Sequence, residues 1–295
     1  KICEAWNRKE CMVIFQYKEG RLREKDSLLE ALPFCNVVEP KPGLVRGPGS
    51  SIQPRDMPLE TPGDSENKHF GECPVVSVVG AGGKTSLIRE LAREYAAGGG
   101  QVIVMTTTHM MAEELPWFLT EPSEARMDSL LKKYGQVWMG IPSGQGKIQS
   151  LPAEFLPRIW RKKVPVLIEA DGARRLPLKA PAEHEPVILP ETTHVLSVYG
   201  LDALGKRLDE VCFRPELAAV LLKKGKTQRD TEEDNAVIAT SERAGRKACP
   251  GNAGYTVILN KADSRRLRES ALAICGLLER QGTGDVIVSS CAEQR

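Results

Sequence analysis

The sequence lacks the features that would mark an exported, membrane-spanning or zinc-ribbon protein. Its eight cysteines are scattered and none belongs to a CxxC pair, so zinc-ribbon spacing is absent. No apolar run reaches the roughly 18–20 residues that cross a bilayer, and no secretory signal opens the sequence. Scattered thiols without an export signal are typical of a reducing compartment. We therefore expect a cytoplasmic protein with no membrane partner.

An excess of positive charge is also missing. Lys and Arg number 41 against 39 Asp and Glu, and the longest basic run is Arg161-Lys162-Lys163. Proteins that bind nucleic acids more often carry a basic face or a longer basic run. We expect no nucleic-acid partner. The 295 residues are enough for one large domain or two modest ones.

The composition changes near residue 73. Residues 1–73 hold short apolar runs and then a stretch rich in Pro, Gly and Ser, from 39 to 71. Such a segment buries too little apolar surface to offset the entropy lost on ordering. We expect residues 1–73 to be a mostly disordered N-terminal extension with one helix near 25–32, and residues 74–295 to be the folded domain.

Residues 74–295 alternate short β-branched runs with helical stretches. This alternation predicts a doubly wound, mostly parallel α/β sheet with helices on both faces, a three-layer sandwich. Glycines at 98–100 stop the first helix. The expected strands are 75–79, 102–105, 137–140, 166–169, 195–199, 256–259 and 286–288, and the expected helices are 84–97, 152–162, 215–224, 231–240 and 264–280.

A glycine-rich loop between the first strand and the first helix, residues 80–86, carries the strongest chemical signal. Glycines let backbone N–H groups converge on phosphate oxygens, and a helix N-terminus adds its positive dipole. Lys84 would reach the β- and γ-phosphates, and the Thr85 hydroxyl would ligate Mg²⁺. The residues expected to contact a nucleoside triphosphate are Gly80, Ala81, Gly82, Gly83, Lys84, Thr85 and Ser86.

The match to the common phosphate-loop pattern is imperfect. Val78 stands where the first glycine is usual, so the loop is the shortened GxxGKT form, also seen in amino-acid ligases that build cell-wall precursors. The alternative interpretation is a tight turn with a surface lysine. The GGKT run directly after a buried strand favours phosphate binding.

Two carboxylates close the expected strand 166–169. Glu169 is its last residue, and Asp171 follows in Glu-Ala-Asp-Gly. Carboxyl ends of parallel strands share one sheet edge, where a magnesium ligand or a water-orienting group belongs. We favour Asp171 for the metal and keep Glu169 as its alternative. A helix cap or an ordinary loop residue is the other interpretation.

Residues 106–109, Thr-Thr-Thr-His, follow the expected strand 102–105. Thr108 and His109 are candidates to sense a γ-phosphate or to orient water. The alternative is that the threonines cap the next helix.

The run Asn260-Lys261-Ala262-Asp263 has the NKxD pattern of GTP-binding proteins. In that pattern the Asp accepts hydrogen bonds from guanine, the Lys stem packs on the base, and the Asn braces the loop. The same letters also suit a helix start. The pattern favours GTP and leaves ATP open.

A charged loop follows the carboxylates. It contains Lys179, Glu183, His184 and Glu185, and Asp202 and Lys206 follow the next strand. Loops beyond the carboxyl ends of the strands share one crevice, so these charged groups either form a pocket for a second substrate or, on a rigid surface loop, remain solvated.

Taken together, these segments resemble the YqeC family, whose members are described as accessory proteins of selenium-dependent molybdenum hydroxylases. The most specific segment is the run 176–188, and the others are 79–85, 106–109, 169–173, 200–206, 214–216 and 259–263. The resemblance implies a P-loop NTPase-like domain that acts in maturing a selenium-dependent molybdenum hydroxylase, with that enzyme or its cofactor-maturation proteins as partners. Arg175 and Arg207 depart from the family pattern, and we expect neither to touch the nucleotide site.

Three functions fit these motifs. The first is an NTPase that needs Mg²⁺, with Lys84, Thr108, His109 and Asp171 as catalytic residues. The second is a kinase, ligase or nucleotidyl transferase that acts on a small molecule. The third is a nucleotide-binding scaffold without turnover.

Overall fold

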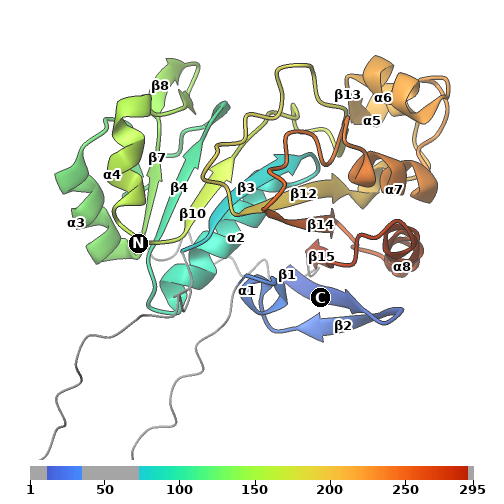
Figure 1. Cartoon of the computed structure of the whole chain (residues 1–295), viewed down its shortest axis with the longest axis horizontal. Coiled ribbons are helices and arrows are strands. Elements are labelled where there is room, and N and C mark those ends of the chain that lie inside the picture. Colours follow the sequence, from blue (N-terminus) through green and yellow to red (C-terminus); the bar gives the residue numbers. More distant parts are fainter. Residues whose placement is uncertain (1–11, 35–72, 292–295) are drawn as a thin grey trace, which may run out of the picture.

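The computed structural model describes residues 12–34 and 73–291, which are built around one large mixed sheet (Figure 1). The sheet has ten strands in the order β2-β1-β15-β14-β12-β3-β10-β4-β7-β6. All neighbours from β15 to β6 run parallel, whereas β1 runs antiparallel to β15 and β2 runs antiparallel to β1. The strands are β1 (Met12–Lys18), β2 (Arg21–Lys25), β3 (Val75–Gly80), β4 (Val102–Thr106), β6 (Phe118–Leu119), β7 (Gln136–Met139), β10 (Val166–Glu169), β12 (His194–Gly200), β14 (Gly254–Asn260) and β15 (Val286–Cys291).

The parallel strands form where the sequence predicts them, because each is apolar on both faces. Val76 and Val78 of β3 face one side and pack on α1 (Leu28–Ala31) and α2 (Lys84–Ala97). Val75 packs on the other side, with α3 (Glu124–Tyr134) and α4 (Leu156–Trp160), which follows the 3-10 turn η1 (Ala153–Phe155). Val79 also faces that side, with α7 (Glu232–Thr240) and α8 (Arg265–Arg280). Helices thus cover both faces of the sheet, as the α/β prediction requires.

The chain reverses its direction of winding at β3. From β3 it builds outward through β4 and β7 and returns to place β10 beside β3, and β12, β14 and β15 then extend the other half. In open parallel sheets, ligands bind beyond the carboxyl ends of strands at such a reversal. The loops after β3, β10 and β12 therefore occupy the place where a site is expected.

Smaller elements lie beyond these carboxyl ends. A three-stranded sheet contains β5 (His109–Met111), β8 (Ile141–Gly144) and β9 (Lys147–Gln149). A second pair joins β11 (Leu178–Lys179) to β13 (Cys212–Phe213). The 3-10 turn η2 (Leu201–Ala203), α5 (Leu208–Val211) and α6 (Pro215–Leu222) complete this region. Neither small sheet nor α3 was predicted.

The hairpin of β1 and β2 is the clearest difference from the expected organisation. We expected residues 1–73 to be mostly disordered, but residues 12–25 extend the main sheet beside β15. Glu19 and Gly20 form the two-residue loop with φ values of 52° and 75°, the backbone of a type I′ turn. The expected helix is present as α1, whereas residues 1–11 and 35–72 lie outside the described residues. The boundary between the extension and the domain stays a prediction.

No helix within residues 12–34 and 73–291 combines the length and the apolar composition that crossing a membrane requires.

Candidate functional site

The glycine-rich loop, residues 80–86, connects β3 to α2 at the carboxyl edge of the sheet. Its backbone needs glycine at Gly80, Gly82 and Gly83, whose φ values are 90°, 82° and 124°. A Cβ at Gly80 would collide with the backbone of Val198, and one at Gly82 with the backbone of Gly200. The loop therefore packs directly against the end of β12.

The N–H groups of the loop fall into two sets. Those of Gly80, Ala81 and Gly82 are used within the protein: they donate to Asp171 Oδ2 (3.1 Å), the Val198 carbonyl (2.8 Å) and the Leu176 carbonyl (3.1 Å). The N–H groups of residues 83–86 donate to no group in the described part of the chain. A helix leaves its first N–H groups free in this way, and they form a ready site for an anion.

Lys84 is the first residue of α2, and its side chain turns back over the loop. Its Nζ donates to the Gly80 carbonyl (2.7 Å) and lies 3.1 Å from Asp171 Oδ1. Only 5% of the Lys84 side chain is exposed, so the ammonium group is held at the loop by contacts with the protein.

Glu169 and Thr85 meet beside the loop. The Thr85 hydroxyl donates to Glu169 Oε2 (2.7 Å). Burial raises the pKa of Glu169, and the charge of Lys84 and the hydrogen bond from Thr85 oppose that rise. Of the two carboxylates considered for a metal, Glu169 is therefore the one that contacts Thr85.

Asp171, which we favoured for the metal, is engaged by the protein instead. Lys179 Nζ lies 2.9 Å from Asp171 Oδ2 and 2.8 Å from Glu185 Oε2, and it donates to the Gly172 carbonyl (2.6 Å). Arg214 binds both carboxylate oxygens of Glu185 (2.7 and 3.2 Å). Burial would raise the pKa of Glu185, but these hydrogen bonds outweigh it and lower the pKa. Lys179 and Glu185 of the charged loop thus belong to a buried ion network, whereas Glu183 and His184 are exposed.

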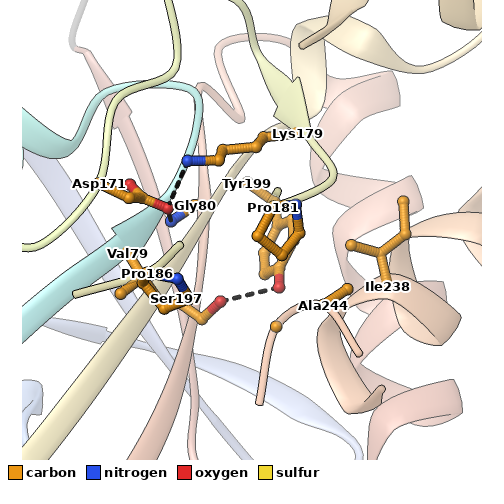
Figure 2. A pocket seen from close by; sticks show the side chains of 11 residues that line it. Val79, Gly80, Asp171, Lys179, Pro181, Pro186, Ser197, Tyr199, Ile238 and Ala244 are labelled. Carbon is orange, nitrogen blue, oxygen red and sulfur yellow. Dashed lines mark hydrogen bonds and ion pairs between the residues drawn. The ribbon is translucent and has the colours of Figure 1, made fainter. Parts of the chain in front are cut away.

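Figure 2 shows the inner side of this network, where Asp171 and Lys179 face a small cavity of about 10 Å³. The Tyr199 and Ser197 hydroxyls lie 2.8 Å apart on its far wall, and burial raises the pKa of Tyr199 well above its ordinary value. A cavity of this size has room for about one water molecule. It offers no space for a nucleotide.

Residues 106–109 do not cap a helix, because the next element is the strand β5. The Thr106 hydroxyl donates to the Glu169 carbonyl (2.9 Å) and accepts from the Thr108 N–H (3.0 Å), which ties this loop to β10. His109 is exposed and lines a cleft above the glycine-rich loop, whereas the Thr108 hydroxyl is buried. The structuring role of Thr106 was not predicted.

The Asn-Lys-x-Asp run, residues 260–263, touches the glycine-rich loop from β14. Asn260 Nδ2 donates to the Gly82 carbonyl (2.8 Å), and its Oδ1 accepts from the Ser289 hydroxyl (2.9 Å). Lys261 has a left-handed φ of 64°, lines the cleft and pairs with Asp202 (2.8 Å). Asp263 is exposed just before α8. Asn260 thus contacts the glycine-rich loop directly.

The cleft above the loop has a volume of about 750 Å³. Its floor is formed by residues 82–86 and Glu169, one wall by the small sheet from His109 to Lys147, and the other by residues 172–176 and Phe213. Arg174 and Arg175 belong to this second wall. Arg175, which we expected not to touch the nucleotide site, therefore lines the same cleft as the glycine-rich loop, because the turn that carries it packs on Gly82. Arg207 lies outside the lining and pairs with Asp209.

Known proteins resemble the part of the chain that contains this cleft. The family described as YqeC protein matches residues 76–216. A protein of Escherichia coli (strain K12), named Uncharacterized protein YqeC, is 39% identical over 139 residues, which make up 45% of this chain. The match spans about half of that relative, 54% of its length. These two findings agree with the resemblance read from the motifs: residues 76–216, just under half of the chain, match the YqeC family.

Proposed function

We propose that the chain binds a nucleoside triphosphate with Mg²⁺ at the glycine-rich loop and acts as an NTPase of the P-loop type. The observation that carries this proposal is the set of N–H groups of residues 83–86, which are free of partners in the described chain and open onto the cleft. Free N–H groups at the start of a 14-residue helix, with a lysine at its first position, suit a phosphate chain.

The donor set also fits magnesium. Thr85 and Glu169 bring a hydroxyl and a carboxylate together, which are oxygen ligands of the kind that Mg²⁺ takes alongside phosphate oxygens. The described residues contain no group of three or more His, Cys, Asp or Glu side chains that could hold a metal ion. The protein would therefore supply only a few of the ligands of the Mg²⁺ ion. When bound, the ion would neutralise charge that develops on the phosphates.

Asn260 supports a guanine base. It holds the Gly82 carbonyl from below, which is the bracing role expected for the first residue of the Asn-Lys-x-Asp run. Asp263 would then accept hydrogen bonds from guanine that adenine does not offer. We infer GTP as the preferred nucleotide, with ATP as its competitor.

The biological role that we propose follows the family. The chain would act in maturing a selenium-dependent molybdenum hydroxylase, with that enzyme or its maturation proteins as partners. This proposal rests on the match of residues 76–216 to the YqeC family alone.

Calorimetry with Mg–GTP and Mg–ATP tests the nucleotide proposal. Wild type should bind GTP in the micromolar range, Lys84→Ala should lose about tenfold or more for both nucleotides, and Asp263→Ala should lose only the preference for GTP. Lys132→Ala, on the exposed side of α3, is the control. Wild-type protein that binds neither nucleotide would refute the proposal.

A further inference from the structure

The cleft extends well beyond the start of α2. Its volume of about 750 Å³ lies in the upper part of the range for small-molecule sites, roughly 300–1,000 Å³. Residues 82–86 and Glu169 line it, together with residues of β5, β9 and the turn 172–176. The lining therefore reaches well beyond the glycine-rich loop.

Most of the charges of the cleft that have no counter-ion are positive. Glu113 pairs with Arg89, and Glu185 pairs with Lys179 and Arg214, whereas Glu169 has only the hydrogen bond from the Thr85 hydroxyl. The cations Lys84 and Lys261 are paired with Asp171 and Asp202. Three lining cations form no ion pair within residues 12–34 and 73–291, namely Lys147, Arg174 and Arg175.

The turn that carries the two arginines is fixed to the glycine-rich loop. Arg174 and Arg175 both have left-handed backbones, with φ values of 49° and 63°, which non-glycine residues keep only where their surroundings enforce it. Leu176 N–H donates to the Ala173 carbonyl (3.0 Å), and the Leu176 carbonyl accepts from the Gly82 N–H (3.1 Å). The arginines are thus held at a set place relative to Gly82.

The aromatic ring of Phe213 supports one of these side chains. The Arg174 guanidinium lies 5.0 Å from the ring centroid, and the Arg214 guanidinium lies 4.1 Å from it. Arg214 is committed to Glu185, whereas Arg174 has no carboxylate partner in the described chain. Stacking orients a guanidinium and leaves its N–H groups free to bind.

We infer that Arg174 and Arg175 form a subsite for a second small molecule that carries a carboxylate or phosphate group, held in the same cleft as the triphosphate. The guanidinium fork matches both kinds of anion in a bidentate way. The inference rests on the proposed function, because it places the second molecule beside a bound nucleotide. It also differs from the pocket expected at Lys179 and Glu185, which are buried in the ion network.

Inorganic phosphate and succinate serve as probes of the two anion classes. Calorimetry would titrate each into wild type loaded with Mg–ADP and into nucleotide-free protein. The same titrations are repeated with the double variant Arg174→Gln/Arg175→Gln and with Lys84→Ala. The control is the double variant Lys132→Gln/Lys133→Gln, which removes two adjacent charges on α3 outside the cleft. Thermal unfolding checks that each variant folds. Arg175→Gln alone replaces the double variant if the latter does not fold.

We expect at least one probe to bind the Mg–ADP form, about tenfold or more weaker in the double arginine variant and within about threefold of wild type in the control. Two results would overturn the inference: neither probe binds wild type, or the arginine variant weakens Mg–ADP binding as strongly as it weakens probe binding. If wild type fails to bind nucleotide, the proposed function fails. Probe binding to the nucleotide-free protein then tests the subsite independently of the nucleotide. That binding should weaken in the arginine variant and stay unchanged in Lys84→Ala.

Discussion

Thr85 donates its hydroxyl to the carboxylate of Glu169 over 2.7 Å, which joins the first turn of α2 to the last residue of β10. The two groups stand at neighbouring strand ends, since β10 pairs with β3 in parallel. Because Glu169 is buried, its charge is disfavoured and its pKa is raised. A cation at this point would favour the charged form, so metal binding and the ionisation of Glu169 should be coupled.

Glu169→Gln tests this coupling. Glutamine can still accept from Thr85 but carries no charge, so the variant avoids the cost of ionising a buried carboxylate. A raised native pKa means that stability falls as the pH rises through it, so ligand-free Glu169→Gln should melt above wild type at pH 8 and near it at pH 4. With Mg–GTP present, wild type should gain stability and the variant should gain much less, with affinity reduced about 10–100-fold.

Thermal unfolding at the two pH values, with and without Mg–GTP, measures both effects. Glu113→Gln is the matched control, because Glu113 lines the same cleft but pairs with Arg89. If Glu169→Gln gained as much from Mg–GTP as Glu113→Gln does, Glu169 would have no part in holding the metal.

Asp171 and Lys84 should differ in their effects on folding. Asp171→Ala leaves two buried lysines, Lys84 and Lys179, without their shared carboxylate, and we expect a loss of about 3–5 kcal/mol in the free energy of unfolding. Lys84→Ala leaves Asp171 paired with Lys179 and bonded to the Gly80 N–H, so its loss should stay within about 1.5–3 kcal/mol, the value of one hydrogen bond to a charged group. Urea unfolding of both variants measures the difference. Equal losses would show that the ion network is not centred on Asp171.

The parallel half of the fold could be predicted because its information is local. Each central strand is apolar on both faces, as in Val75–Gly80, and α2 has an apolar stripe and ends at its glycines. The hairpin of β1 and β2 is different, since β1 holds only a short apolar run, β2 is mostly charged, and the sheet partner of the hairpin is β15, at the other end of the described chain. Only the Glu19-Gly20 turn signals it locally.

The candidate site shows the same difference between residues that local sequence predicts and residues that only the fold brings together. Lys84, Thr85 and Glu169 stand out because a loop and a strand end position them directly. The pairing of Asp171 with Lys179 and the placement of Arg175 depend on contacts between segments that are separate in sequence, so no motif contains them. Spacing alone therefore points to Asp171 as a metal ligand and gives no sign that Arg175 lines the cleft.

Asn260 should matter for both the fold and the ligand. It is 5% exposed and bridges the Gly82 carbonyl to the Ser289 hydroxyl. Asn260→Ala leaves both partners without their hydrogen bonds inside the protein, which should cost about 1–3 kcal/mol of stability and loosen the glycine-rich loop. GTP and ATP should both bind less tightly, whereas Asp263→Ala changes only the preference between them. A variant with lower stability but unchanged nucleotide affinity would show that the bridge serves folding alone.

The last prediction concerns Asp230, a buried carboxylate that lies outside the cleft lining, before α7. Burial raises the pKa of Asp230 to about 7, and a hydrogen bond from Asn235 Nδ2 (2.8 Å) opposes the rise only in part. Between pH 4 and 7 the folded protein therefore holds a proton that the unfolded chain has released. The contribution of this bound proton to stability is complete at low pH and is lost as the pH rises towards 7, by at most about 4 kcal/mol.

Asp230→Asn, which does not titrate, should show a smaller fall in the free energy of unfolding between pH 5 and pH 8 than wild type, as measured by urea unfolding. Asp209→Asn is the control, because Asp209 pairs with Arg207 at the surface and its pKa is lowered by that hydrogen bond. Parallel curves for wild type and Asp230→Asn would mean that Asp230 is ionised in the folded protein throughout this range.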